Sequence, residues 1–409
     1  MNKIIDLKSL FFLVKNNAII SVLSYFLTIF LANYFGPEIF GTYSSVLIIA
    51  SALSILLSYQ TESIAPVMHA MKRTNEYILR NIIFCRLYLF ISLLFLSLFL
   101  SFFLNYELIF FIICLLPASL NLSFFYEIKY LNKRYSYIFL LERVAYISLV
   151  LLAFYLKALS IFLIFFISLI TILGSLYFQF RDCGFFKSKI SAPKIKCTLS
   201  ILKMNFPLVI ISLSLFAYGG FSRLILENKL STEWLGIYSA GWQIVTIASI
   251  YQSQITRIWR VSIVKSVNTN NLIDLKNLIF GYFIFSTLPL LLITLFIYFK
   301  SSFIVNLLYS SKYSKLEPLL PYFSFYMVTI NFFGLVELLW LSFKRYNLYM
   351  VINLFFSTLL ILFLFLLPNG TNPKFFILTT TIVQTLAAIF LLFFWIRLSK
   401  INFNLNSLI

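Results

Sequence analysis

Six ionisable side chains lie inside long apolar stretches of the sequence or near their ends. A charged side chain at the centre of a membrane helix costs about 2.5–3.5 kcal/mol on insertion scales, and less near the helix ends. Residues that bear this cost commonly mark the path of an ion or a polar substrate. We therefore treat the six as candidate substrate-binding residues. They are Glu62, Arg86, Glu142, Arg143, Arg223 and Glu337.

The three arginines point to recognition of an anion. A guanidinium group is planar and always charged, and its fork of N–H donors matches the oxygens of phosphate. Arg86, Arg143 and Arg223 are therefore predicted to bind an anionic group within the membrane. Glu62 or Glu142 would pair with these arginines when the site is empty. The alternative is that the side chains reach lipid headgroups or form ordinary ion pairs between helices.

Uncharged polar side chains in the apolar stretches extend this chemistry to sugars. Their amide groups can bind hydroxyls, although hydrogen bonds between helices explain them equally well. These residues are Asn205, Gln243, Gln252, Gln254, Asn331 and Gln384. The four cysteines lack metal-ligand spacing and are expected to be reduced, and no glycine-rich phosphate loop is present. We predict neither a catalytic residue, nor a metal, nor a cofactor.

The elements that carry these side chains are predicted to be membrane-spanning helices. Apolar residues make up 61% of the 409 positions and charged residues 11%, with a mean hydropathy of +0.97. Such a chain cannot fold in water without exposing large apolar areas, and a helix needs about 20 apolar residues to cross a bilayer. The predicted fold is all-α, with twelve membrane spans. The span cores are residues 15–35, 40–66, 82–104, 107–126, 137–156, 158–178, 204–226, 233–256, 277–299, 318–340, 347–367 and 373–396. Kinks are expected at prolines in or beside these spans, namely Pro66, Pro117, Pro207 and Pro289.

The distribution of basic residues predicts the orientation. The chain has 32 Lys and Arg against 13 Asp and Glu. Because the cations lie between apolar runs, their predicted partners are anionic membrane lipids and not nucleic acid. Lys and Arg are retained on the cytoplasmic side during insertion, and few lie in the predicted outer loops, so both termini are predicted to be cytoplasmic. The outer cations are Lys157, Lys229, Lys300, Lys312, Lys315 and Lys374.

The chain is predicted to divide into two homologous halves. The break from Gln179 to Lys203 is the longest and is basic, which predicts an N-terminal bundle, a cytoplasmic linker and a C-terminal bundle. Their predicted limits are residues 1–180, 181–203 and 204–409. Residues 31–44 read LANYFGPEIFGTYS and residues 226–239 read LENKLSTEWLGIYS, an offset of 195. Each copy follows the first span of its half, as a parallel duplication requires.

These motifs resemble those of the Wzx-type O-antigen and capsular polysaccharide flippases, within the multidrug/oligosaccharidyl-lipid/polysaccharide exporter superfamily. The resemblance implies two six-helix bundles around a central cavity. It further implies a carrier in the bacterial inner membrane that moves undecaprenyl-diphosphate-linked oligosaccharide for lipopolysaccharide or other surface polysaccharide. Arg86 and Arg143 are then expected to line this cavity and to pair with the diphosphate. A polymerase and a chain-length regulator are further partners that such a pathway implies. The residues that carry the resemblance are Phe35, Gly36, Pro37, Glu38, Phe40, Gly41, Tyr43 and Ser44, with the echo Leu235, Gly236, Ile237 and Tyr238.

Two other functions fit a membrane protein of this composition. A polytopic polysaccharide polymerase would be an enzyme with reactive residues on a long outer loop, but the longest outer stretch, Lys300 to Glu317, has no paired carboxylates. A drug/cation antiporter of the same superfamily would need an acidic cavity. The embedded arginines favour an anionic substrate and hence the flippase.

Overall fold

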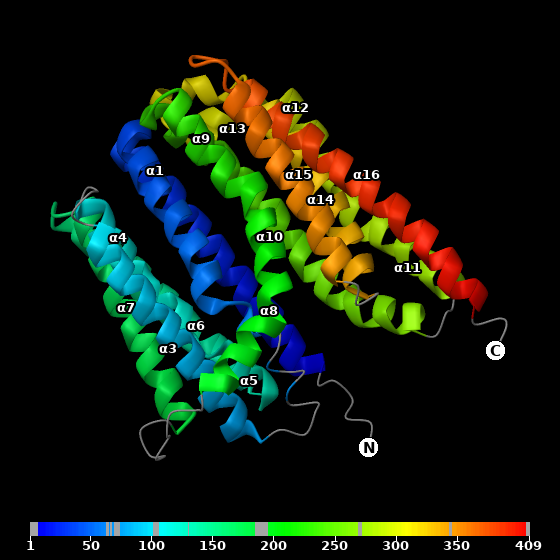
Figure 1. Cartoon of the computed structure of the whole chain (residues 1–409). Coiled ribbons are helices and arrows are strands. Elements are labelled where there is room, and N and C mark those ends of the chain that lie inside the picture. Colours follow the sequence, from blue (N-terminus) through cyan, green and yellow to red (C-terminus); the bar gives the residue numbers. More distant parts are fainter. Residues whose placement is uncertain are drawn as a thin grey trace. The chain divides into compact units, whose positions relative to one another are not determined.

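The structure, a computed structural model, consists of helices and connecting turns (Figure 1). It describes residues 7–62, 65, 68, 74–100, 106–129, 131–184, 195–268, 272–342 and 346–405. Within these ranges there is no strand, and nine helical stretches are long and apolar enough to cross a membrane. The first of them, Ile19–Ser58, contains most of the first predicted span and most of the second. The predicted all-α, multi-pass membrane fold is confirmed.

The chain forms two compact units. The first comprises residues 1–27 and 46–209, and the second comprises residues 28–45 and 210–409. Helices α1 and α8 contribute to both units. The elements of the first unit are α3 (Asn75–Leu100), α4 (Tyr106–Leu115), the 3₁₀ helix η1 (Leu116–Leu120), α5 (Ser123–Ile128), α6 (Asn132–Tyr155) and α7 (Ile161–Asp182), with parts of α1 (Leu7–Ser58) and α8 (Ile195–Phe216).

The second unit holds the remaining elements. Its longest helix, α10, runs without interruption past both ends of the predicted span 233–256. Two short stretches, η2 and η3, are π-helical. The elements are η2 (Ala217–Phe221), α9 (Ser222–Lys229), α10 (Thr232–Asn268), α11 (Leu272–Tyr282), η3 (Phe283–Thr287), α12 (Leu288–Phe299), α13 (Ser301–Leu308), the 3₁₀ helix η4 (Ser311–Leu316), α14 (Leu320–Ser342), α15 (Tyr346–Leu366) and α16 (Lys374–Leu405).

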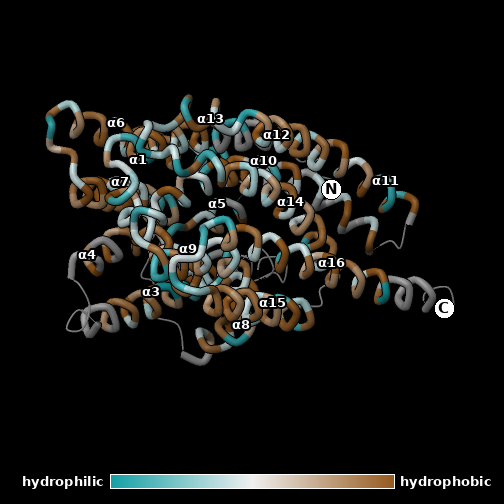
Figure 2. Tube along the Cα trace, turned by 90° about the horizontal axis from the view of Figure 1, so that it is seen from above, coloured by the Kyte–Doolittle hydropathy of each residue, from teal (hydrophilic) through white to brown (hydrophobic). Residues whose placement is uncertain are grey.

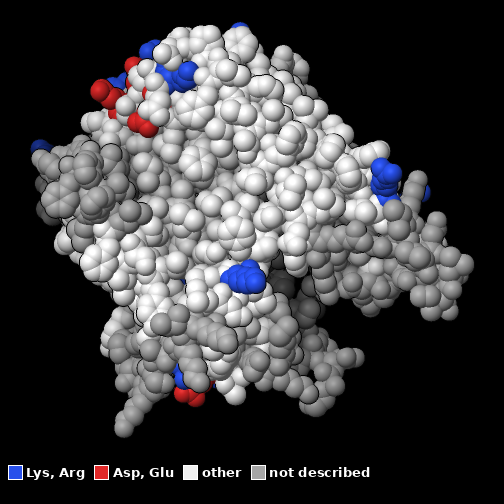
Figure 3. Space-filling view, in the orientation of Figure 1, with Lys and Arg blue, Asp and Glu red and all other residues white. Residues whose placement is uncertain are grey.

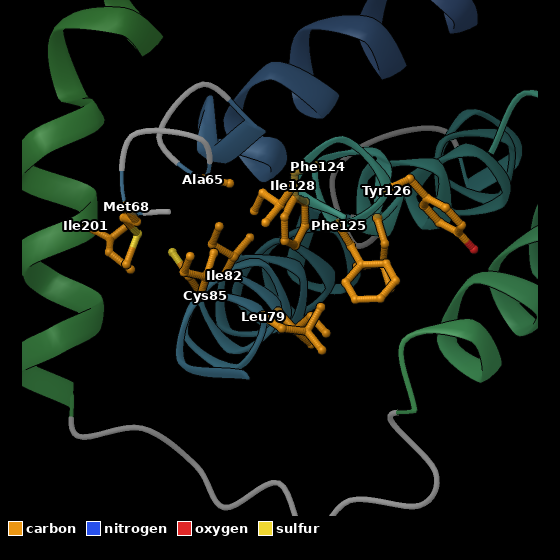
Figure 4. Packing of buried hydrophobic residues seen from close by; sticks show 13 residues of the cluster. Ala65, Met68, Leu79, Ile82, Cys85, Phe124, Phe125, Tyr126, Ile128 and Ile201 are labelled. Carbon is orange, nitrogen blue, oxygen red and sulfur yellow. The ribbon is translucent and has the colours of Figure 1, made fainter. Parts of the chain in front are cut away.

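The core of the first unit lies where α3, α5 and α8 meet. Ile82 and Cys85 of α3 and Tyr126 of α5 are fully buried, and Ile201 of α8 packs against the same cluster (Figure 4). None of the four cysteines forms a disulfide. Because α3 is apolar along its length, it buries one face here and leaves the other for lipid.

Helix α14 forms the centre of the second unit. It packs against α10, α12 and α16. Two-thirds of its membrane-spanning window is buried inside the protein, compared with 11% for α6 of the first unit. Polar side chains on α14 therefore face other helices. Brown, hydrophobic segments dominate α12, α15 and α16 in Figure 2.

The outer surfaces of the helices are apolar, as a lipid environment requires. Phe299, Ile273 and Leu366 are among the large apolar side chains that are at least 74% exposed. In the face shown in Figure 3, the described charged residues form a few separate groups with broad uncharged areas between them. This pattern is typical of a surface solvated by hydrocarbon.

The first repeated motif forms a break in α1. Gly36 has φ +76° and ψ 173°, a backbone conformation that residues with a side chain rarely adopt, and Pro37 follows it. The break lies between the predicted spans 15–35 and 40–66. Residues 28–45 around it belong to the second unit, whereas the rest of α1 belongs to the first.

The two repeated motifs contact each other reciprocally within the second unit. A methyl group at Gly41 would clash with the carbonyl oxygen of Thr232, and one at Gly236 would clash with the carbonyl oxygen of Pro37. The offset of 195 relates Gly41 to Gly236 and Pro37 to Thr232. Each copy therefore makes the same contact with the other.

Hydrogen bonds to the loop between α12 and α14 hold the first motif in place. The Asn33 amide donates to the carbonyl oxygen of Leu308 at 2.9 Å and accepts from the amide N–H of Ser310 at 2.7 Å. The buried hydroxyl of Tyr313 donates to the carbonyl oxygen of Ala32 at 3.1 Å. Residues 28–45 are thus fixed to the second unit by polar contacts as well as by close packing.

The predicted linker 181–203 is partly helical. Helix α7 ends at Asp182 and α8 begins at Ile195, so residues 195–203 form its first turns. These residues include Ile201, whose burial in the first core accounts for the helix. Residues 185–194 lie outside the described part of the chain. The limits 1–180 and 204–409 stay predictions.

Candidate functional site: a polar cavity in the second unit

A cavity of about 220 Å³ lies among the membrane helices of the second unit. It is formed by the end of α8, the π-helical turn η2, and helices α10, α14 and α16. Aromatic rings, two amides and a carboxylate line it together. The lining residues are Leu215, Tyr218, Gly219, Trp242, Gln252, Tyr326, Ile330, Phe333, Gly334, Glu337 and Gln384.

Two glycines make room for larger side chains in the cavity wall. A methyl group at Gly219 would come within 2.7 Å of the indole of Trp242, and one at Gly334 would overlap the amide of Gln252. Gly219 lies in η2, and such π-helical turns occur frequently at functional sites. The absence of a side chain at both positions lets α8 and α14 approach the rings and amides of α10.

The aromatic side chains at the cavity form two groups of packed rings. The ring centroids of Trp242 and Tyr326 are 5.1 Å apart, and those of Tyr218 and Phe333 are 6.1 Å apart. Tyr238 stacks on the other side of the first group, with its centroid 6.4 Å from that of Trp242. Such contacts fix the ring orientations, so the cavity has a rigid apolar face.

Arg223 lies directly beside this face. Its guanidinium carbon is 5.0 Å from the ring centroid of Trp242, and its Nε donates to the carbonyl oxygen of Gly219 at 2.5 Å. No described residue accepts a hydrogen bond from its terminal nitrogens Nη1 and Nη2. Glu337 lines the same cavity. The structure thus brings two of the six predicted residues to one place, Glu337 in the wall and Arg223 against it.

Several buried polar atoms at the cavity have no partner among the described residues. They are the hydroxyl groups of Tyr218 and Tyr238 and the amide oxygen of Gln384. The side chains of Tyr218 and Gln384 line the cavity and are only 1% and 6% exposed. Buried polar groups are nearly always hydrogen-bonded, so these atoms mark a place where a polar ligand or water belongs.

Arg86 of the first unit has a different environment. It is 1% exposed and donates four hydrogen bonds. Its Nε donates to Thr61 Oγ1 at 2.8 Å, and its Nη1 donates to the carbonyl oxygens of Ser119, at 3.2 Å, and Asn121. Its Nη2 pairs with Glu62 at 3.4 Å. These partners lie at the end of α1 and around the 3₁₀ break η1, so the geometry favours a structural role, while a substrate role stays a prediction.

Glu142 and Arg143 are half-buried on α6. The Arg143 guanidinium lies 5.4 Å from the ring centroid of Phe139. Its Nε is buried without a hydrogen-bond partner among the described residues. Arg143 therefore keeps donor capacity for a ligand, which Arg86 largely lacks.

The other predicted amides divide into two groups. Gln252 and Gln384 line the cavity, whereas Asn331 accepts from Ser286 Oγ at 2.5 Å and donates to Thr287 Oγ1 at 2.8 Å. Asn331 thus joins α14 to the π-helical turn η3, as expected if its amide serves a hydrogen bond between helices and not a sugar hydroxyl. The side chain of Gln254 lies outside the described part of the chain.

The sequence analysis did not identify Tyr218, Trp242 or Tyr326. Aromatic residues are 19% of the chain, so no single ring stands out. The pair Gly219 and Gly220 was the only local signal for the π-helical turn, because adjacent glycines inside a span weaken regular helix.

Comparison with protein families identifies the chain. The model of the polysaccharide biosynthesis protein family matches residues 7–257, more than half of the sequence. The chain belongs to this family. No curated protein matches the sequence.

Solved structures share the fold of this polysaccharide biosynthesis protein. A multidrug resistance MATE family transporter of the MOP superfamily, in its inward-facing conformation, has a TM-score of 0.69 at 13% identity, over 93% of this chain and 94% of the other. An outward-facing MATE structure gives 0.68 at 14% identity, over 96% of both chains. A MOP superfamily transporter from Pyrococcus furiosus, for which a binding pocket of reverse polarity is described, gives 0.62 at 13% identity, over 96% of both. The family match confirms the predicted link to polysaccharide biosynthesis, and at these identities the likeness to the solved structures shows the fold alone.

Proposed function

We propose that this protein is a flippase that moves undecaprenyl-diphosphate-linked oligosaccharide repeat units across the bacterial inner membrane. The product would serve O-antigen, lipopolysaccharide or another surface polysaccharide. One observation carries the proposal: a chain of the polysaccharide biosynthesis family has the fold of multi-pass transporters. A step of polysaccharide synthesis that needs a transporter is the transfer of its lipid-linked intermediate between leaflets. Both termini would then be cytoplasmic, and a polymerase and a chain-length regulator would act on the product.

The distribution of polar groups within the membrane supports an anionic, sugar-bearing substrate. Arg143 of the first unit has a buried guanidinium Nε–H without a hydrogen-bond acceptor among the described residues. A diphosphate supplies such acceptors in a fitting geometry. Amide and phenol groups at the cavity of the second unit match sugar hydroxyls.

The polymerase alternative has little support in the outer segment. Residues 300–317 form α13 and η4, and Lys315 there pairs with Glu233 at 2.8 Å. Among the described residues of this segment no two carboxylates lie together as an acid and a base would. The solved structures with this fold are transporters.

The antiporter alternative is disfavoured by the charge at the cavity. A cationic drug would gain from Glu337, but Arg223 stands against the same wall and would repel it. An anionic or zwitterionic substrate avoids that repulsion.

The direct test is deletion of the gene in a strain that makes a surface polysaccharide, followed by an assay of which leaflet holds the lipid-linked units. We expect single units to accumulate on the cytoplasmic leaflet. Wild type should restore export, and Arg143→Ala should restore it about 10-fold less well, which corresponds to a loss of about 1.4 kcal/mol. Arg181→Ala is the matched control, because Arg181 is an exposed arginine of the same unit. Units that reach the periplasmic leaflet but stay unpolymerised would instead identify a polymerase.

A further inference from the structure

The cavity of the second unit has the properties of a binding site for one sugar ring. Its volume, about 220 Å³, lies below the ~300–1,000 Å³ that is usual for drug-sized ligands. A lipid-linked oligosaccharide as a whole does not fit there, but a single ring does. A ligand of this cavity is therefore either a small molecule or one residue of a longer substrate.

The walls supply two complementary kinds of contact. Trp242 and Tyr326 present a rigid aromatic face, on which the apolar C–H side of a pyranose can pack. The Tyr218 hydroxyl and the Gln384 amide oxygen, both buried and without partners among the described residues, can bind ring hydroxyls. A purely apolar ligand, such as a lipid tail, would leave these polar groups unsatisfied at a cost.

Arg223 adds a preference for negative charge. Its Nε is used by the carbonyl oxygen of Gly219, and its cationic centre is held over Trp242, so Nη1 and Nη2 remain as donors beside the cavity. In a membrane interior an arginine gains most from an anionic acceptor. Glu337, on the same wall, can accept from sugar hydroxyls.

From these observations we infer that the cavity binds a single sugar ring that carries a carboxylate, with the carboxylate at Arg223 and the ring against Trp242. This inference rests on the proposed function, because a uronic acid would reach the cavity as part of the transported repeat unit. It assigns the second unit a role in sugar selection that is separate from binding of the diphosphate.

The test uses the full-length protein in detergent and measures quenching of tryptophan fluorescence. The probes are galacturonate and glucuronate, with galactose and glucose as uncharged counterparts of the same shape. We expect saturable quenching by at least one uronate, at least 5-fold tighter than by its neutral counterpart. Trp242→Phe should remove most of the signal.

Two further variants separate binding from folding. Arg223→Gln should abolish the preference for the uronate while keeping the wild-type thermal midpoint and weak binding of both sugars. Arg181→Gln, which changes an exposed arginine of the first unit, should leave quenching unchanged. If neither uronate quenches saturably up to about 100 mM, or if Arg223→Gln keeps the preference, the inference is overturned. Saturable quenching by the lipophilic cation tetraphenylphosphonium and not by sugars would overturn it in favour of a cation site.

The leaflet assay keeps this failure distinct from failure of the proposed function. If deletion of the gene traps units on the cytoplasmic leaflet and the protein binds no uronate, the proposed flippase function stands and only the proposed sugar subsite is refuted. Units that cross normally without the gene would remove the flippase, whatever the cavity binds.

Discussion

The buried network around Arg86 gives the sharpest stability prediction. Arg86→Ala would leave Glu62, Thr61 and the carbonyl oxygens of Ser119 and Asn121 without their donor inside the first unit. Because Glu62 is half-exposed and can be resolvated, most of the cost comes from the buried acceptors that lose a charged donor, at roughly 1–3 kcal/mol each and about 3–5 kcal/mol in total. For a unit of this size about 2–4 °C of melting temperature is lost per kcal/mol, so the midpoint should fall by about 6–20 °C.

The protein's own cysteines provide the assay. Cys85 and Cys114 are buried in the first unit, so a thiol-reactive fluorogenic dye labels them only when this unit unfolds. Cys183 and Cys197 are partly exposed and are replaced by serine to lower the background. Purified protein in detergent is then heated with the dye, and the midpoint of labelling is compared between variants.

Two control substitutions make the result specific. Arg181→Ala removes an exposed arginine, which lies 5.3 Å from the ring centroid of Phe178, and should shift the midpoint by less than about 2 °C. Arg86→Lys keeps the charge but loses the planar fork that reaches several partners at once, so its midpoint should lie between those of wild type and Arg86→Ala. If Arg86→Ala melts within about 2 °C of Arg181→Ala, the hydrogen bonds of Arg86 contribute no net stability. That result would favour a substrate-binding role for Arg86.

Other contacts lead to further expected outcomes. Gly41→Ala and Gly236→Ala should each lower the midpoint of a circular-dichroism melt by a similar amount, because each added methyl group has a packing cost of about 1–3 kcal/mol. Gly174→Ala, with open space around it, should be neutral or stabilising. Unequal losses at Gly41 and Gly236 would count against the reciprocal contact. Asn331→Ala should cost about 1–2 kcal/mol in the same melt, because its bonds to η3 are lost, and an unchanged midpoint would show that they contribute nothing. Asn33→Ala should raise protease cleavage in the loop after α12, since its side chain holds Leu308 and Ser310; unchanged cleavage would contradict this.

Helix positions were predictable from the sequence because hydrocarbon imposes a long apolar run on each span. The predicted cores 137–156 and 318–340 coincide with α6 and α14 to within a few residues. Short elements outside the spans were not predictable in this way. Helix α13 and the 3₁₀ helix η4 are too short for a hydropathy window, and their positions depend on contacts such as that of Tyr313 with α1.

Breaks inside the helices were predictable only in part. Pro117 lies in the 3₁₀ turn η1, and Pro289 follows the π-helical turn η3, as expected of kinks at proline. Pro207, in contrast, lies inside α8, which continues to Phe216. A proline thus marks a weakened place in the helix, and the packing around it decides whether the helix ends there.

The residues of the candidate site were also predictable from the sequence only in part. Glu337, Gln252 and Gln384 were identifiable because polar side chains are rare in apolar spans. Trp242 and Tyr326 were not, because the same residue types cover the lipid-facing surfaces, and only packing distinguishes a ring in the cavity from one in the bilayer. Arg86 and Arg223 look alike in the sequence, and they differ only in how many acceptors the fold places around them.

The reciprocal contact of Gly41 with Thr232 and of Gly236 with Pro37 has the form of an isologous interface, in which one patch meets its own copy about a two-fold axis. Homodimers make such contacts, and a single chain acquires one when the gene of a symmetric dimer is duplicated and fused. The ancestor of this protein would then have been a shorter membrane protein that paired with itself through this glycine. The two copies differ near this contact, since the offset of 195 places Thr28 where the second copy has Arg223.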